Sequence, residues 1–219
     1  MIPLRDDNPS RSPPVATVAL IGACVAVFLR MGSLDGPALL AFITAYGAVP
    51  ARLLADPLGA APTLVTHMFL HGGWVHLLGN MLYLWIFGDN VEDLMGHMGF
   101  VAFYLLSGVA AVLTHTLLAP LSDRPLVGAS GAVAGVLGAY LVLFPRARIL
   151  SLVPMGLFTR VVAVPAVVFL PLWFVLQLVS GLASLDGQAE MVAWWAHVGG
   201  FVAGVLLVPV FVRRRRPRW

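Results

Sequence analysis

Six long apolar stretches, separated by polar or proline- and glycine-rich segments, dominate the pattern along this chain of 219 residues. A helix that crosses a bilayer needs roughly 20 apolar residues, and most of the stretches approach that length. They cover residues 15–31, 74–87, 99–118, 130–144, 161–179 and 191–212. Pro165 and Pro171 are expected to bend the fifth stretch. The pattern therefore predicts six transmembrane helices.

The segments between the stretches have the composition of loops. Residues 1–14 are polar and rich in proline, so we expect a short unstructured tail rather than a cleavable signal peptide. Residues 32–61 are half apolar but interrupted by Gly and Pro, which predicts a loop lying in the membrane interface. Residues 180–190 are expected to form a polar loop. The predicted division is an N-terminal tail (1–14), a membrane domain (15–212) and a basic C-terminal tail (213–219).

Composition supports the membrane assignment. The chain is 60% hydrophobic and only 11% charged, with a mean hydropathy of +0.93. A soluble domain is nearer half apolar and a quarter charged, so an ordinary soluble protein is excluded. Cys24 is the only cysteine, so no intrachain disulfide can form.

The arginines predict the orientation of the chain in the membrane. With six spans both termini lie on one side, and that side holds ten of the thirteen arginines, five of them in the segment 213–218. The other side holds Arg30, Arg52 and Arg124. Positive residues favour the cytoplasm, so both termini are expected there, in a multi-pass protein of a bacterial-type plasma membrane. The basic tail is therefore interpreted as a determinant of orientation, and no nucleic-acid partner is expected.

Ser130 lies between glycines at the point where a polar loop becomes an apolar helix. A serine on the first turn of a helix lies beside backbone N–H groups that lack intrahelical partners. Those donors and the helix dipole would stabilise an oxyanion next to the hydroxyl, which suits a nucleophile. The alternative is that Ser130 only caps the helix.

His197 lies inside the sixth apolar stretch, where a histidine usually faces a cavity or a polar partner. The alternative is a histidine that only bonds a neighbouring backbone carbonyl. The fourth and sixth stretches cross the membrane in the same direction, so Ser130 and His197 are expected at similar depth in its outer half. A serine with an imidazole base beside it is the minimum apparatus for nucleophilic catalysis.

Glycines accompany both side chains at a spacing that lets two membrane helices approach closely. Those expected to pack the fourth stretch against the sixth are Gly128, Gly131, Gly135, Gly200 and Gly204. This packing would bring Ser130 and His197 together.

His76 and Asn80 form an i, i+4 pair on one face of the second stretch, at a similar predicted depth. An imidazole N–H and an asparagine amide can donate hydrogen bonds to an oxyanion. The alternative is that the pair only joins neighbouring helices.

As a set, these motifs resemble the rhomboid family of intramembrane serine proteases. The resemblance covers nearly the whole chain from Val15 onward. It rests on Gly128-Ala129-Ser130-Gly131, on Ala196-His197 with Gly200 and Gly204, and on the segment 71–80 that runs from His71 through His76 to Asn80.

The resemblance implies an all-α membrane protein, a six-helix bundle around a water-filled cavity that opens outward. It implies a dyad of Ser130 and His197 with no acidic member. It also implies an oxyanion site of His76, Asn80 and the Ser130 N–H. Its partners are expected to be transmembrane protein substrates and the lipid bilayer, its substrates entering between the second and fifth stretches, and no cofactor is expected.

Two positions depart from the family pattern. Many members have an aromatic residue one turn after the nucleophile, packed against the base, where this chain has Ala134. His197 is therefore expected to be oriented by other contacts, such as Tyr83 of the second stretch. A Trp-Arg pair common in the first outer loop of some members is missing, since Arg52 follows no tryptophan.

The sequence disfavours three other functions. His67, His71 and His76 do not share one helix face and no His-Glu-x-x-His motif is present, so no metal site is expected. An inactive rhomboid-like protein that binds membrane clients is disfavoured because the motif residues are intact. A small-solute transporter would show internal repeats or matched broken spans, and the sequence shows neither.

Overall fold

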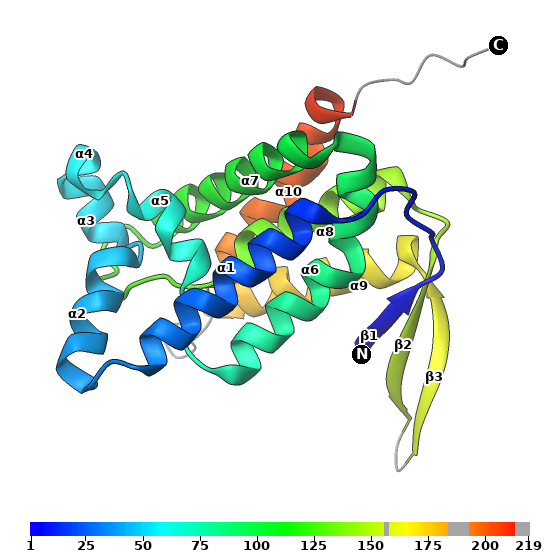
Figure 1. The fold of residues 1–219 in the computed structure, drawn as a ribbon, viewed down its shortest axis with the longest axis horizontal. Coiled ribbons are helices and arrows are strands. Elements are labelled where there is room, and N and C mark those ends of the chain that lie inside the picture. The colour runs from blue at the N-terminus through cyan, green and yellow to red at the C-terminus, as the bar shows by residue number, and fades with distance from the viewer. Residues whose placement is uncertain (156–157, 184–192, 213–219) are drawn as a thin grey trace.

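The computed structural model describes residues 1–155, 158–183 and 193–212. Within them, six long helices form a bundle, with short helices at one end and a small β-sheet at the other (Figure 1). The long helices are α1 (Val15–Gly32), α6 (Trp74–Met95), α7 (His97–Leu118), α8 (Ser130–Leu143), α9 (Ala166–Ala183) and α10 (Trp194–Phe211).

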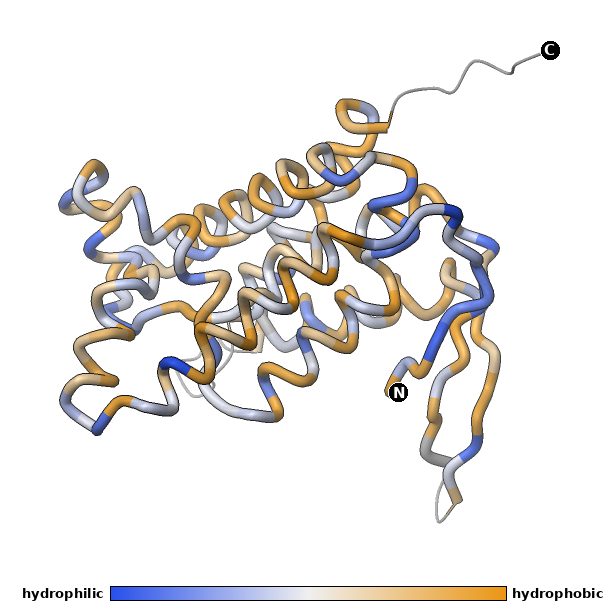
Figure 2. Tube along the Cα trace, viewed as in Figure 1, coloured by the Kyte–Doolittle hydropathy of each residue, from blue (hydrophilic) through white to orange (hydrophobic). Residues whose placement is uncertain are grey.

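Several of these helices have the length and composition of membrane spans. Among the described residues, α1, α7 and α10 are long and apolar enough to cross a bilayer, while α8 and the 166–180 part of α9 are apolar but shorter. Figure 2 shows the apolar character along these helices and the hydrophilic residues along the N-terminal segment. The chain is thus a mostly helical integral membrane protein, and the count of six spans stays a prediction.

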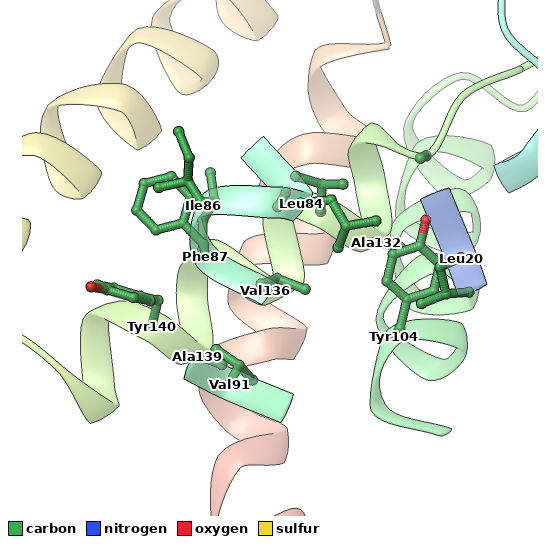
Figure 3. Close-up of a cluster of buried hydrophobic side chains, with 14 of the residues drawn as sticks. Leu20, Leu84, Ile86, Phe87, Val91, Tyr104, Ala132, Val136, Ala139 and Tyr140 are labelled. Carbon is green, nitrogen blue, oxygen red and sulfur yellow. The ribbon is translucent and has the colours of Figure 1, made fainter. Parts of the chain in front are cut away.

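The central element of the bundle is α8, which is buried from Gly131 to Tyr140. Its glycines and alanines leave room for neighbours on every side. Figure 3 shows Ala132, Val136 and Ala139 among side chains of α6 and α7, and the Tyr140 ring lies 5.0 Å from that of Phe87. This arrangement positions the first residue of α8, Ser130, inside the bundle.

Helix α10 begins and ends close to the predicted bounds of the sixth span, 191–212. Helix α6, predicted to cover residues 74–87, is longer than expected. It continues beyond residue 87 to Met95, and this last part carries Glu92, which is only 1% exposed and has partners inside the protein. Its carboxylate accepts hydrogen bonds of 2.8 Å from the backbone N–H groups of Ala16 and Thr17, and so caps the first turn of α1. The acidic residues near the end of α6 therefore connect α6 to α1 and do not mark the point where α6 ends.

Residues 32–61, expected to form a loop, are largely helical. They contain α2 (Gly36–Tyr46), α3 (Pro50–Ala55) and α4 (Pro57–Ala60), followed by α5 (Thr63–Thr66) and the 3-10 helix η1 (His67–Phe69). The glycines and prolines mark the boundaries between short helices. Asp35, for example, caps α2 by accepting a 3.0 Å hydrogen bond from Ala38 N.

The N-terminal tail is not unstructured, and the protein is not all-α. Strand β1 (Ile2–Asp6) pairs with β2 (Arg148–Met155), which pairs with β3 (Phe158–Pro165), in an antiparallel sheet of order β1-β2-β3. The polar composition of the tail does not predict this strand. The strand forms by pairing with a segment more than 140 residues further along the chain.

The fifth long helix begins later than the apolar stretch 161–179 predicts. Residues 161–165 belong to β3, since the valines there are β-branched and favour a strand. The helix starts at Ala166, so Pro165 marks a boundary while Pro171 lies inside α9. Residues 180–183 continue this helix, and the rest of the expected polar loop, like the tail 213–219, lies outside the described residues.

Candidate functional site

Ser130 and His197 lie in contact at the centre of the bundle. Ser130 is the first residue of α8, and His197 lies on the first turn of α10. The distance from Ser130 Oγ to His197 Nε2 is 2.7 Å, a hydrogen bond. The hydroxyl and the imidazole thus have the geometry that proton transfer between them requires.

Of the glycines predicted to pack α8 against α10, Gly131 and Gly135 mainly admit α7, because a Cβ there would overlap Ala111 or Ser107. A Cβ at Gly131 would find its nearest α10 atom at 3.7 Å, an ordinary contact. Gly200 and Gly204 let the backbone of α10 touch that of α8, because a Cβ on either would overlap the carbonyl of Gly131 or Gly135. This close approach sets the short distance between Ser130 and His197.

Gly128 has a different place from the one predicted. It precedes α8 and lies against α6, with a φ of +126° that L side chains rarely adopt. A Cβ there would lie 2.7 Å from Nε2 of His76 and 3.7 Å from Nδ2 of Asn80. The glycine therefore lets the backbone next to Ser130 approach the two predicted oxyanion donors.

Backbone hydrogen bonds hold the segment that leads to Ser130. Leu126 N donates to Ala48 O at 2.7 Å, and Gly128 N donates to His67 O at 2.9 Å. The 32–69 region thus anchors the loop that precedes α8 by backbone hydrogen bonds. These bonds help to position Ser130, the first residue of α8.

Asn80 is 93% buried, and its Nδ2 has no hydrogen-bond partner among the described residues. A buried amide donor without a partner is costly, and such groups often act on a ligand or substrate. His76 lies one turn earlier on α6, and its Nδ1 accepts a long hydrogen bond of 3.5 Å from Gly72 N. Both side chains line the same cavity as Ser130.

Besides Ser130, the His197 ring contacts side chains of α9 and the Trp194 ring of α10, 6.1 Å away, and the ring contacts of the described residues do not include the expected one with Tyr83. Gln177 Oε1 lies 2.9 Å from His197 Nδ1, and the Trp173 ring lies 6.0 Å from the imidazole. Tyr83 instead has its ring contact with Phe87, at 6.0 Å. The signal that could have found Gln177 is simple, because it is the only amide or charged residue in the apolar stretch 161–179.

These residues surround one cavity of about 1120 Å³, formed between α6, α7, α8, α9 and α10. Its lining includes Ser130, His197, His76, Asn80, Trp173 and Gln177. The lining mixes aromatic and apolar surface with a few convergent polar groups, as small-molecule and substrate sites do.

Two further histidines, His67 and His71, bond to backbone carbonyl oxygens near the site. Burial lowers the pKa of His67 and of His71 to about 4, so both are neutral at pH 7. Nδ1 of His67 lies 2.8 Å from Thr63 O, and Nδ1 of His71 lies 3.3 Å from Phe69 O. Within the described part of the chain, no group of three or more His, Cys, Asp or Glu side chains suits a metal ion. The expectation of no metal stays a prediction.

The comparisons with known proteins all point to the same family. The rhomboid domain model matches residues 59–214. RHOMBOID-like protein 5 of Arabidopsis thaliana is 31% identical over 98% of this chain and 63% of its own length. Rhomboid protein 1, mitochondrial, of Saccharomyces cerevisiae is 33% identical over 86% of this chain and 51% of its own.

A bacterial relative is named as a protease. Rhomboid protease GluP of Bacillus subtilis is 28% identical over 87% of this chain and 34% of its own length. The chain thus spans a third to two thirds of the length of these three relatives. The matched domain contains the Ser130–His197 pair, the two α6 side chains and the glycine contacts, and the chain belongs to the rhomboid family.

Proposed function

We propose that this protein is an intramembrane serine endopeptidase in which Ser130 is the nucleophile and His197 the general base. The observation that carries the proposal is the 2.7 Å hydrogen bond between Ser130 Oγ and His197 Nε2, inside a cavity of about 1120 Å³. A serine in contact with an imidazole is activated, because the base takes its proton as the hydroxyl attacks.

The length of α8 supports chemistry below the membrane surface. Its 14 residues span only about 21 Å at 1.5 Å per residue, against a hydrocarbon core of roughly 30 Å. A helix whose inner end reaches the cytoplasmic interface would place Ser130 several ångströms inside the bilayer. Irregular backbone such as residues 119–129 is tolerated at that depth where it lines a water-filled cavity.

The proposed topology has six spans, formed by α1, α6, α7, α8, α9 and α10, with both termini in the cytoplasm. The arginine distribution supports this orientation. The cavity would then open toward the outer side, in a bacterial-type plasma membrane.

The reaction follows from the groups present. Neutral His197 takes the Ser130 proton while Oγ attacks the carbonyl carbon of the scissile bond. The tetrahedral intermediate collapses to an acyl-enzyme as protonated His197 gives its proton to the leaving amine. Water from the cavity, activated by the same imidazole, then hydrolyses the ester and regenerates Ser130.

The developing oxyanion would be held by His76, Asn80 and the Ser130 N–H. The unpartnered Nδ2 of Asn80 supports this assignment, since a free donor needs no rearrangement to receive a negative charge. Gly128 keeps the space between these groups open, because a side chain there would meet the His76 ring.

The substrates proposed are transmembrane helices of other proteins. A helix uses its carbonyls in its own hydrogen bonds, so it must unwind near the cleaved bond before Ser130 can attack. Helix-breaking residues near that bond are therefore expected in substrates. We place the entrance between α6 and α9, which both line the cavity.

The second candidate is an inactive rhomboid-like protein that binds membrane clients. It has no need for a serine bonded to an imidazole, or for a buried amide donor without a partner. A small-solute transporter remains disfavoured, because the sequence shows no matched repeats.

A fluorophosphonate probe in detergent or liposomes tests the proposal. The probe reacts with an activated hydroxyl, so the wild type should be labelled on Ser130 and Ser130→Ala should not be labelled. His197→Ala should nearly abolish labelling, while Ser122→Ala, a serine in the loop before α8, should label at the wild-type rate. Labelling of Ser130→Ala at the wild-type rate would refute the dyad, and a wild type without labelling would favour the client-binding alternative.

A further inference from the structure

The base has a second partner that neither the sequence motifs nor the dyad account for. His197 is bonded on both ring nitrogens: Nε2 to Ser130 Oγ at 2.7 Å and Nδ1 to Gln177 Oε1 at 2.9 Å. The three side chains come from α8, α10 and α9, and together they form one continuous chain of hydrogen bonds.

We infer that Gln177 is a positioning residue that holds the His197 imidazole in the tautomer able to act as base. This inference rests on the proposed function, because a tautomer matters only if His197 accepts a proton. It concerns a residue that touches the base and not the substrate.

The argument starts from what an amide oxygen can do. Oε1 of a glutamine only accepts hydrogen bonds, so the Nδ1 that faces it must carry the proton. A neutral imidazole has one proton, and Nε2 is then left with a lone pair pointing at Ser130 Oγ. The opposite tautomer would place an N–H against the serine hydroxyl and could not take its proton.

The orientation of the ring is held by the same helix. Trp173 lies one turn before Gln177 on α9, and its ring lies 6.0 Å from the His197 ring and 6.2 Å from the Phe201 ring. On α8, the position where many family members have an aromatic residue against the base is Ala134, which is fully buried. The ring contacts of His197 come instead from Trp173 of α9 and from Trp194 of α10, whose ring lies 6.1 Å away.

The apolar character of the neighbouring α9 positions argues against a purely structural role for Gln177. The neighbouring positions Leu172, Leu176 and Val179 are 43%, 57% and 56% exposed on the bundle surface and are apolar, as a lipid-facing surface would be. An amide in such a helix is costly unless it has a partner. Among the described residues, the side-chain partner recorded for Gln177 is the base itself.

The test compares three variants with the wild type. Gln177→Met keeps the length and removes the acceptor, and it should lower fluorophosphonate labelling of Ser130 about tenfold, the effect of losing one ordinary hydrogen bond. Gln177→Glu keeps an oxygen acceptor at the same place and should restore most of the labelling. Leu176→Met, the exposed neighbour on the same helix, is the matched control and should label like the wild type.

A second readout does not depend on activity. With 15N-labelled histidine, the His197 signals, identified by their absence in His197→Ala, should show the proton on Nδ1 in the wild type. They should show a mixture of tautomers in Gln177→Met and recovery in Gln177→Glu. A residue that only packs helices would change stability without moving this tautomer signature.

The outcomes separate the two proposals. Wild-type labelling together with unchanged labelling and unchanged tautomer in Gln177→Met would overturn the role of Gln177 and leave the protease proposal standing. No labelling of the wild type, with a tautomer that still depends on Gln177, would overturn the protease proposal and keep the positioning role. A wild type with the proton on Nε2 would refute the inference in either case.

Discussion

Adding one methyl group at Gly200 should disable the site without touching a reacting atom. Gly200 lies one turn after His197 on α10, and its backbone rests on Gly131, the residue after Ser130. An alanine Cβ at Gly200 would lie 2.9 Å from the carbonyl carbon of Gly131, closer still to its oxygen, and 3.3 Å from the Ala111 methyl. Both sides of the contact are helix backbone or short side chains, so neither can turn away.

The size of the displacement follows from the same contacts. Ordinary contact for a Cβ begins at 3.4 Å, so α10 must move away from α8 by more than an ångström to clear the Gly131 carbonyl oxygen. The Ser130–His197 distance of 2.7 Å would then exceed the range of a good O–H···N hydrogen bond. Misplacement by 1 Å can cost about a hundredfold in rate, and overpacking costs about 1–3 kcal/mol of stability.

The assay is the rate of Ser130 labelling by a fluorophosphonate, measured beside the thermal unfolding midpoint of the same sample. Gly200→Ala should label about a hundredfold more slowly while remaining inserted and folded. Gly22→Ala is the control, because a Cβ at Gly22 in α1 meets nothing within 4 Å. A folded Gly200→Ala that labels at the wild-type rate would refute the claim that glycine contacts set the dyad distance.

Three further predictions follow from the structure. His76→Ala and Asn80→Ala should each lower turnover by about 10²–10³ without abolishing it, since one lost oxyanion donor has that effect in a serine protease; turnover that stays unchanged would return the residue to a packing role. In a chain lacking its native thiol, a cysteine at Ser10 should resist an impermeant reagent in intact cells while one at Leu121 reacts, and the reverse pattern would invert the topology. Burial raises the pKa of the Asp6 carboxyl to about 6, above its ordinary value of 3.8, so its contribution to β1 docking is full below pH 4 and is lost as pH rises through about 6. Amide exchange along β1, corrected for intrinsic rate, should therefore show less protection at pH 8 than at pH 5 in the wild type. In Asp6→Asn, which lacks the titrating carboxyl, protection should be the same at both pH values. Equal protection at both pH values in the wild type would contradict the argument.

The membrane helices and the main polar pair could be predicted because their signals are local or periodic. An apolar run predicts a span wherever it lies, and a glycine repeat of four predicts which face of a helix can approach another. The approach of Ser130 to His197 followed from these two rules, and the structure places them 2.7 Å apart. Their roles in catalysis remain a proposal.

The polar contacts of Glu92 and Asp93 could not be predicted in the same way. Their position at the end of an apolar stretch suggests only a helix end. In the structure Glu92 caps α1, and Asp93 accepts hydrogen bonds from the backbone N–H and the hydroxyl of Ser12. Which helix end a buried carboxylate meets depends on how the bundle closes, and one helix alone does not contain that information.

Strand β1 and Gln177 are two further cases in which the local sequence does not reveal the partner. The polar, proline-containing tail has no strand pattern of its own, and it forms a strand by pairing with the edge of β2. Gln177 was visible as an isolated amide, but its partner became known only when α9 packed beside α10. The sequence by itself determined the number and character of the apolar stretches and the chemistry of the residues they carry. Only the tertiary structure decided which polar atoms meet, because a hydrogen bond between distant residues depends on helix rotation and separation to within about an ångström.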